Sequence, residues 1–224
     1  MKKLFTSFLL LIVGIGLSWA DNPVIINMKT LVDTQGATNT AVDFSGDNTT
    51  AYLFISNRDS KKNIKGIDNS TITNALEDGQ KYVTVAAWIY GNTSTGCIFG
   101  YGDANNGVKF MMQGTGTTMR TTTKGKTDYE TGTATLQPNE WNLVAFAFKR
   151  NVSSRYYWST TNGTYTTVEN TTYRMNTPAD TGKKIAIGSG DQGADREGFN
   201  GIIANMVVII SFNSLIPAVV KVLP

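Results

Sequence analysis

Short apolar segments recur along the chain and are separated by polar turns. The segments with a pattern typical of strands are residues 41–44, 52–56, 82–90, 97–101, 108–113, 141–149, 155–160, 184–187 and 198–210. Turn signals rich in Asn, Asp and Gly lie between them. One short helical turn is expected at 72–76. Because no helical pattern alternates with the strands, the order predicts an antiparallel sandwich rather than an α/β sheet.

The segment 141–149, WNLVAFAFK, carries apolar residues on both faces that a strand would present. Alternation places Val144 and Phe146 on one side and Trp141 and Leu143 on the other. A buried helix could give the same continuous pattern. The flanks decide, because a Pro-Asn turn precedes the segment, and an aromatic and Thr-rich stretch with an Asn-Gly turn follows it. We expect a central strand that is covered on both faces.

The first twenty residues have the features of a secretory signal peptide. Two lysines precede an apolar stretch at 8–17, and the tripeptide SWA at 18–20 supplies a cleavage site with small residues. The apolar stretch is too short to span a bilayer. We therefore expect a signal peptide at 1–20 and a single domain at 21–224 that is secreted or held at the cell surface. No cysteine follows the apolar stretch, so a lipid anchor is not expected, nor is a transmembrane segment in the mature chain.

Charge and residue types exclude several classes of function. The chain has 20 basic and 17 acidic residues, a net charge of +3, and no basic run longer than two residues, so it lacks the footprint of a nucleic-acid-binding protein. Histidine is absent, which excludes a Ser-His-Asp triad and histidine metal sites. Cys97 is the only cysteine, so no intrachain disulfide can form, and its apolar neighbours predict a buried side chain.

Six motifs follow one another in order along almost the whole mature chain. They are AVDFSG at 41–46, VTVAAWI at 83–89, WNLVAF at 141–146, IAIG at 185–188, FNGII at 199–203 and FNSL at 212–215. Together they resemble the strand motifs of laminin-G-like or concanavalin-A-like jelly-roll domains, in particular the bacterial extracellular members. The resemblance implies an all-β fold, a two-sheet antiparallel jelly-roll sandwich.

Two positions depart from the pattern of that family. Asn142 stands after Trp141, where these domains often have a histidine. Ala204 and Asn205 stand where an acidic residue often follows the FNGII-type motif. Where the family uses that acidic group to fix the sheet or a nearby loop, this chain has only an amide.

Several aromatic residues could stack on a sugar ring. Tyr157 lies in the densest aromatic run, YYW, and Tyr101 and Tyr129 lie among Gly, Thr and Asn. For each of the three, packing in the core or against a sheet is the alternative. Trp88 and Trp141 lie inside apolar runs and are assigned to the core, so replacing Trp141 by alanine should cost about 3–5 kcal/mol of stability.

The carboxylates do not form the pattern of a glycan hydrolase. Relatives of this fold that cleave β-glucans carry paired carboxylates two or four residues apart on one strand, where period two places both on one face. No Glu-x-Asp-x-x-Glu or similar cluster occurs in the chain. Asp128 and Glu130 lie in a Thr- and Gly-rich segment, and Asp195 and Glu197 lie in a loop with Arg196 as a counter-charge between them. We therefore expect a protein that is not an enzyme.

Calcium is the cofactor that the resemblance implies, because domains of this type often hold it at the rim of the sandwich. Calcium prefers carboxylate and carbonyl oxygens. Asp191 and Asp195, in a polar loop, are the first candidates for its ligands. The alternative is that both are ordinary turn residues.

Three hypotheses about function follow. In the first, the chain is a secreted recognition or adhesion module that binds a glycan or a cell-surface polysaccharide. In the second, a rim or a sheet edge binds another extracellular protein, or the chain is a surface-structural sandwich. In the third, it is a glycan-active hydrolase without a recognisable motif.

Overall fold

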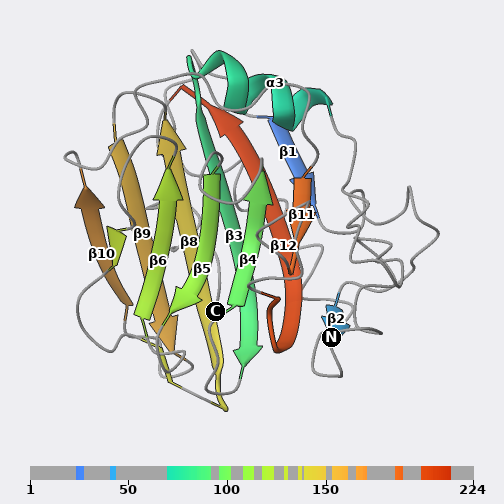
Figure 1. Cartoon of the computed structure of the whole chain (residues 1–224), viewed down its shortest axis with the longest axis vertical. Coiled ribbons are helices and arrows are strands. Elements are labelled where there is room, and N and C mark those ends of the chain that lie inside the picture. Colours follow the sequence, from blue (N-terminus) through green and yellow to red (C-terminus); the bar gives the residue numbers. More distant parts are fainter. Residues whose placement is uncertain are drawn as a thin grey trace, which may run out of the picture.

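A computed structural model describes most of the predicted sandwich. The residues that it describes are 24–27, 41–43, 70–91, 96–101, 108–113, 118–123, 129–130, 136–137, 139–149, 153–160, 165–170, 185–188 and 198–212. Over these residues the chain forms two antiparallel sheets and one helix (Figure 1). The expected signal peptide at 1–20 and the expected strand at 52–56 lie outside the described residues.

The larger sheet, called sheet A, has seven strands in the order β1-β12-β3-β8-β9-β10, and β2 also pairs with β12. The strands are β1 (Val24–Asn27), β2 (Ala41–Asp43), β3 (Tyr82–Gly91), β8 (Trp141–Lys149), β9 (Ser153–Thr160), β10 (Tyr165–Asn170) and β12 (Gly201–Ser211). All their pairings are antiparallel. Strand β3 lies between β12 and β8, at the centre of the sheet.

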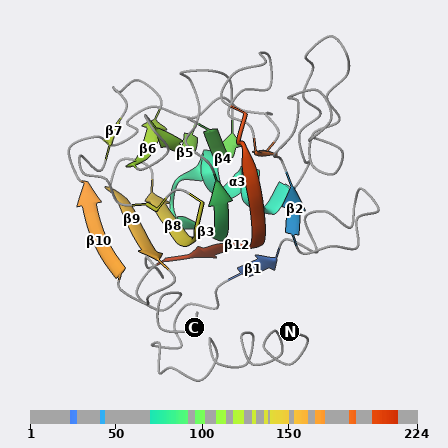
Figure 2. The same cartoon turned by 90° about the horizontal axis from the view of Figure 1, so that it is seen from below.

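The smaller sheet, called sheet B, has five strands in the order β11-β4-β5-β6-β7. The strands are β4 (Gly96–Tyr101), β5 (Val108–Gln113), β6 (Thr118–Thr123), β7 (Tyr129–Glu130) and β11 (Ile185–Ile187). Figure 2 shows the two sheets as separate layers, with β4 to β6 facing β3, β8 and β12. The all-β, two-sheet antiparallel jelly-roll sandwich predicted from the sequence is confirmed.

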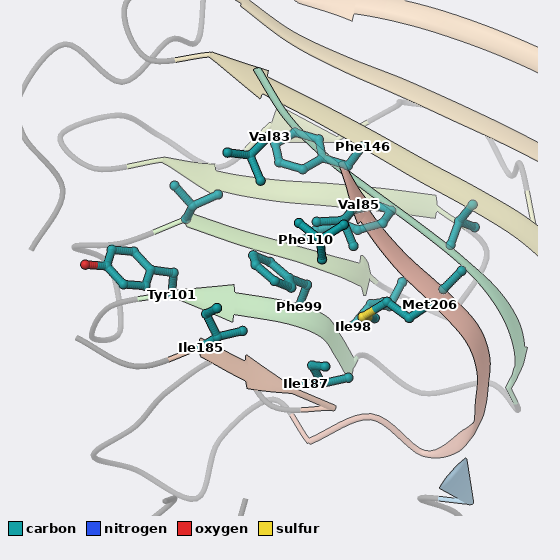
Figure 3. Close-up of a cluster of buried hydrophobic side chains, with 14 of the residues drawn as sticks. Val83, Val85, Ile98, Phe99, Tyr101, Phe110, Phe146, Ile185, Ile187 and Met206 are labelled. Atoms are coloured by element: carbon teal, nitrogen blue, oxygen red, sulfur yellow. The ribbon is translucent and has the colours of Figure 1, made fainter. Parts of the chain in front are cut away.

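The main hydrophobic core fills the space between the two sheets. Phe110 of sheet B stacks on Phe146 of sheet A with ring centroids 5.4 Å apart, and Phe148 continues the stack at 6.1 Å from Phe146. Figure 3 shows Phe99, Phe110 and Phe146 among the aliphatic side chains of both sheets. Each of these rings is at most 2% exposed, so burial of apolar surface is the main force that holds the layers together.

A second apolar layer covers the opposite, outer face of sheet A on strands β3, β8 and β12. Its buried members are Tyr82, Ala86, Leu143, Ala145, Ala147, Val207 and Ile209, and Trp88 packs against them while staying partly exposed. Strand β8 is therefore buried on both faces along most of its length. This confirms the covering expected from the continuous apolar pattern of 141–149.

The helix α3 (Ser70–Asp78) closes one end of the sandwich, at the top of Figure 1. Ile72 and Leu76 enter the main core. Gly79 ends the helix with a φ of 68°, and its N–H donates to the carbonyl of Ala75 at 3.1 Å, the geometry of a left-handed C-cap. The helical turn predicted at 72–76 is confirmed, and it extends further at both ends. Among the described residues, no helix combines the length and apolar character needed to cross a membrane.

A close backbone contact joins β4 to the segment before β12. A Cβ atom placed on Gly96 would lie 2.6 Å from the Cα atom of Phe199. The N–H of Phe199 donates to the carbonyl of Gly188 at 2.9 Å, and the N–H of Gly188 donates to the carbonyl of Ile98 at 3.1 Å. Only glycine fits this approach at position 96 without a shift of the backbone. The neighbouring Cys97 is fully buried, as expected from the sequence.

Candidate functional site

A row of partly exposed apolar side chains crosses the outer face of sheet A at one end. The strand register sets Ile202 of β12 opposite Tyr90 of β3, and Tyr90 opposite Trp141 of β8. Trp88 lies two residues before Tyr90 and therefore on the same face. All four side chains are partly exposed. We call Trp88, Tyr90, Trp141 and Ile202 the aromatic platform.

The rings of Tyr90 and Trp141 form the centre of the platform. Their centroids are 5.6 Å apart and their planes are tilted by 57°. Because neighbouring strands are about 4.8 Å apart, the row from Ile202 to Trp141 spans about 10 Å of backbone. In Figure 1, β3 runs away from the end closed by α3, so the platform lies at the opposite end of the sandwich. Partly exposed aromatic faces of this kind can cover the apolar face of a ligand and leave its polar edge in water.

Exposed polar side chains lie in the turn that leads into Trp141. Gln137, Asn139 and Glu140 are all exposed, and Asn139 has a positive φ of 59°. Asparagine adopts this left-handed conformation more readily than most residues. The turn therefore presents amide and carboxylate groups at the end of β8 where Trp141 lies.

Asn142 fixes the conformation of that turn. Its Oδ1 accepts from the N–H of Gln137 at 3.0 Å, and its Nδ2 donates to the carbonyls of Gln137 and Glu140, both at 2.9 Å. Asn142 is only 2% exposed, so these bonds are sheltered from competing water. Asn142 shares the core-facing side of β8 with Val144 and Phe146, so these bonds hold the turn at that side of the strand. The residue that stands where these domains often have a histidine thus fixes the turn that precedes Trp141.

The two ends of sheet A carry different charged residues on the outer face, among the residues that the structure describes. Glu140 precedes Trp141 at the platform end. Lys149, eight residues after Trp141 and thus about 27 Å away along β8, has its Nζ 5.6 Å from the centroid of Tyr82. Lys81 has its Nζ 4.6 Å from the ring of Phe212, which is 51% exposed. Asp43 of β2 is paired with Ile202 at the platform end, and Arg155 and Glu169 are paired with each other on the same face toward the α3 end. Among the described residues, the platform end therefore has Glu140 and Asp43, and the α3 end has three cations and Glu169.

Tyr101, one of the three tyrosines predicted to bind a ligand, is a core residue. It is 1% exposed, and its hydroxyl donates to Oε1 of Glu77, which links β4 to α3. Figure 3 shows its ring among the apolar side chains of the core. A buried ring offers no face to a ligand, so the expectation for Tyr101 is replaced by a structural role. The burial of Tyr101 was not predicted, because the polar residues that follow it in the sequence are typical of a loop.

Tyr129 and Tyr157 lie in different sheets, and the structure describes only their backbone positions. Tyr129 pairs with Thr121 at the edge of sheet B. Tyr157 pairs with Ala145, a member of the outer layer of sheet A, and therefore occupies a position on the same face as the platform. The three predicted tyrosines are not brought together, and among them Tyr157 shares the face of the candidate site.

The prediction that Trp88 and Trp141 are core residues is wrong. Trp141 begins β8, as predicted, but its side chain is partly exposed on the outer face instead of lying between the sheets. Trp88 is partly exposed on the same face. When a strand is apolar on both faces, the apolar neighbours of a residue do not show which face its side chain is on. The polar turn before Trp141 was the available signal that this end of the strand is accessible.

The predicted calcium ligands, Asp191 and Asp195, lie outside the described residues. Among the residues that are described, no group of three His, Cys, Asp or Glu side chains is placed to hold a metal ion. Calcium binding by this chain therefore stays a prediction.

Comparison with known families agrees with the architecture. The sequence model of the family described as "Concanavalin A-like lectin/glucanases superfamily" matches residues 65–209. The match includes β3 to β11 and most of β12, and it contains Tyr90, Trp141 and Ile202 of the platform. No curated protein matches the chain.

Solved structures with a similar fold are distant. A pentraxin from Limulus polyphemus is 17% identical, with 57% of this chain and 63% of the pentraxin covered and a TM-score of 0.39. A sialidase from Trypanosoma rangeli is 14% identical over 65% of this chain and 22% of the sialidase, with a TM-score of 0.43. A CBM40 domain of a Ruminococcus gnavus sialidase is 18% identical over 62% of this chain and 79% of the domain, with a TM-score of 0.42. The chain thus spans less than two thirds of the pentraxin and under a quarter of the sialidase, and likeness at this level says nothing about a shared ligand.

Proposed function

Because the chain belongs to the concanavalin A-like lectin/glucanase superfamily, we propose that it is a non-catalytic carbohydrate-recognition module that acts outside the cell or at its surface. The observation that carries the proposal is the aromatic platform with the polar turn beside it. Sugar rings have an apolar face and a rim of hydroxyls. A site for them needs an aromatic surface next to groups that donate and accept hydrogen bonds.

The platform supplies the first of these elements. Tyr90 and Trp141 are held by opposite positions on β3 and β8, two neighbouring strands at the centre of sheet A. Their main chains are fixed by the sheet, so little conformational entropy remains to be lost when a ligand binds. Trp88 and Ile202 widen the surface beyond the pair of rings.

The turn supplies the second element. The side chains of Gln137 and Asn139 offer amide donors and acceptors, and Glu140 offers a carboxylate acceptor. Asn142 holds the main chain of this turn, so the polar groups start from a defined backbone. Rigid support of this kind favours selective binding over nonspecific binding.

A binding role fits the arrangement of carboxylates better than hydrolysis does. Glycosidases place two carboxyl groups about 5–9.5 Å apart across the scissile bond. Among the described residues, Glu140 directly precedes Trp141, and Asp43 of β2 is paired with Ile202 at the other end of the row. Three strand spacings, about 14 Å, separate these two backbone positions, which is wider than the separation in a glycosidase. Calcium at Asp191 and Asp195, and contact of Tyr157 with the ligand, remain parts of the proposal that await a test.

A glycan array with the mature chain, run with calcium and again with a chelator, tests the proposal. We expect binding that falls at least tenfold in Trp141→Ala and Tyr90→Ala. The matched control is Phe212→Ala, because Phe212 is an exposed aromatic at the other end of the sheet. Loss of binding on chelation would support the calcium site. An array without any bound glycan, for a protein shown to be folded, would reject the proposal in favour of a protein partner.

A further inference from the structure

Glu140 is the charged group closest in sequence to the rings of the platform. It directly precedes Trp141, its side chain is exposed, and its carbonyl is held by Nδ2 of Asn142 at 2.9 Å. The exposed carboxylate therefore extends from a fixed backbone position one residue before Trp141, on whose ring we expect a sugar to lie. A negative charge here acts on any charged substituent of that sugar.

The described cations on the outer face of sheet A lie too far away to offset that charge, including Arg155, whose position opposite Ala147 is about 20 Å from Trp141 along the strands. Lys149 is about 27 Å from Trp141 along β8, and Lys81 is beside Phe212 at the same distant end. At physiological ionic strength, charges separated by more than about 8 Å are largely screened from one another. A second described acidic residue, Asp43 of β2, is paired with Ile202 of the platform in the strand register. The described charged residues nearest the platform, Glu140 and Asp43, are therefore both acidic, although the net charge of the whole chain is +3.

We propose that Glu140 makes the platform selective for glycans without acidic groups, namely neutral sugars and amino sugars, over sialylated or uronic-acid glycans. This inference rests on the proposed carbohydrate-binding function. A carboxylate accepts hydrogen bonds from sugar hydroxyls or from an ammonium group. It repels the carboxylate of an acidic sugar bound on the same surface. The result is specificity by exclusion as well as by attraction.

Two matched pairs of ligands separate charge from shape. Lactose and sialyllactose differ by an acidic sugar, and oligomers of N-acetylglucosamine and glucosamine differ by an amino charge. We expect the mature chain to bind lactose more tightly than sialyllactose, and the glucosamine oligomer at least as tightly as its acetylated form. An exposed charge at this range changes affinity by about fivefold at low salt, and the difference should shrink at high salt.

The decisive variant is Glu140→Lys, with Glu140→Gln as the neutral intermediate. Glu140→Lys should shift the ratio of sialyllactose to lactose affinity upward by about tenfold, and Glu140→Gln by less. The matched control is Asp78→Lys, which makes the same change of charge at an exposed position of α3. Asp78→Lys should leave the ratio unchanged if the effect is local.

The possible results are distinguishable. If glycans bind and depend on Trp141, but the ratio does not change in Glu140→Lys, the selectivity is rejected and the carbohydrate-binding function stands. If Asp78→Lys changes the ratio as much as Glu140→Lys does, net charge rather than Glu140 controls selection, which also rejects the inference. If no member of either pair or of the array binds to the folded protein, both proposals fail.

Discussion

The side-chain amide of Asn142 holds the main chain of Gln137 from both sides. Its Oδ1 accepts from the N–H of Gln137 at 3.0 Å and its Nδ2 donates to the carbonyl of the same residue at 2.9 Å. A second bond from Nδ2 reaches the carbonyl of Glu140. One buried side chain thus supplies three hydrogen bonds to the main chain of the turn, and it connects the core-facing side of β8 to the residues that precede Trp141.

Asn142→Asp removes the amide donor while it keeps the shape of the side chain. The new carboxylate would be buried at position 142 and would face the carbonyls of Gln137 and Glu140, both of which lose their donor. We expect the free energy of unfolding to fall by about 2–3 kcal/mol. Urea unfolding measures this change. A loss below about 0.5 kcal/mol would show that the three hydrogen bonds do not fix the turn.

Because Trp141 is partly exposed, replacing it should lower the free energy of unfolding by less than replacing a core tryptophan would. Trp141→Ala should cost about 1–2 kcal/mol, because the partly exposed ring buries less surface than a core ring. Phe146→Ala, on the same strand but between the sheets, should cost about 3–5 kcal/mol. Unfolding of the two variants in parallel tests the assignment of faces. Equal losses of unfolding free energy in the two variants would show that Trp141 is a core residue.

The sequence predicted most of the strands with a long apolar pattern, and it missed the short apolar strand β1 and the strands whose pattern is polar. Segments 108–113 and 141–149 were predicted with the bounds that β5 and β8 have. Strand β6, TMRTTT, and β10, YTTVEN, were not predicted, because Thr-rich segments resemble loops when their partners are unknown. Their strand conformation comes from pairing with β5 and β9, which is a tertiary effect that propensity does not contain.

The candidate site was predictable only in part. An aromatic sugar-stacking surface was expected, but the sequence placed it at Tyr101, which the structure buries beside Glu77. The platform depends on the register that sets Tyr90 opposite Trp141, and the register of strands far apart in sequence cannot be read from alternation alone. The order of the family's motifs was enough to predict the fold. The face of the sheet on which each tryptophan lies could be determined only from the strand pairing in three dimensions.

Gly96→Ala tests the close approach between β4 and the segment before β12. The added methyl group would lie 2.6 Å from the Cα atom of Phe199, a backbone atom that cannot move away by a rotamer change. We expect a loss of about 1–3 kcal/mol, seen as a lower thermal midpoint. The hydrogen bond from Phe199 to Gly188 should weaken at the same time, which faster amide exchange of Phe199 would show. Unchanged stability would mean that the two backbones are not in contact.

Thr84 is the polar exception within the outer apolar layer of sheet A. It lies on β3 opposite Ala147 and Ile209, is fully buried, and has no hydrogen-bond partner for its hydroxyl among the described residues. A buried hydroxyl without a partner loses its bonds to water and gains nothing in exchange.

Thr84→Val replaces that hydroxyl by a methyl group of similar size, so the free energy of unfolding should rise by about 1–2 kcal/mol. The control is Thr73→Val in α3, where the Oγ1 atom donates to the carbonyl of Ser70 at 3.4 Å. Thr73→Val should not stabilise the protein, because it removes a bond that is made. Measured by urea unfolding, the two substitutions should therefore differ in sign. If Thr84→Val destabilises the protein as well, the hydroxyl has a partner in solution, and the outer layer is not the dry apolar surface that its burial indicates.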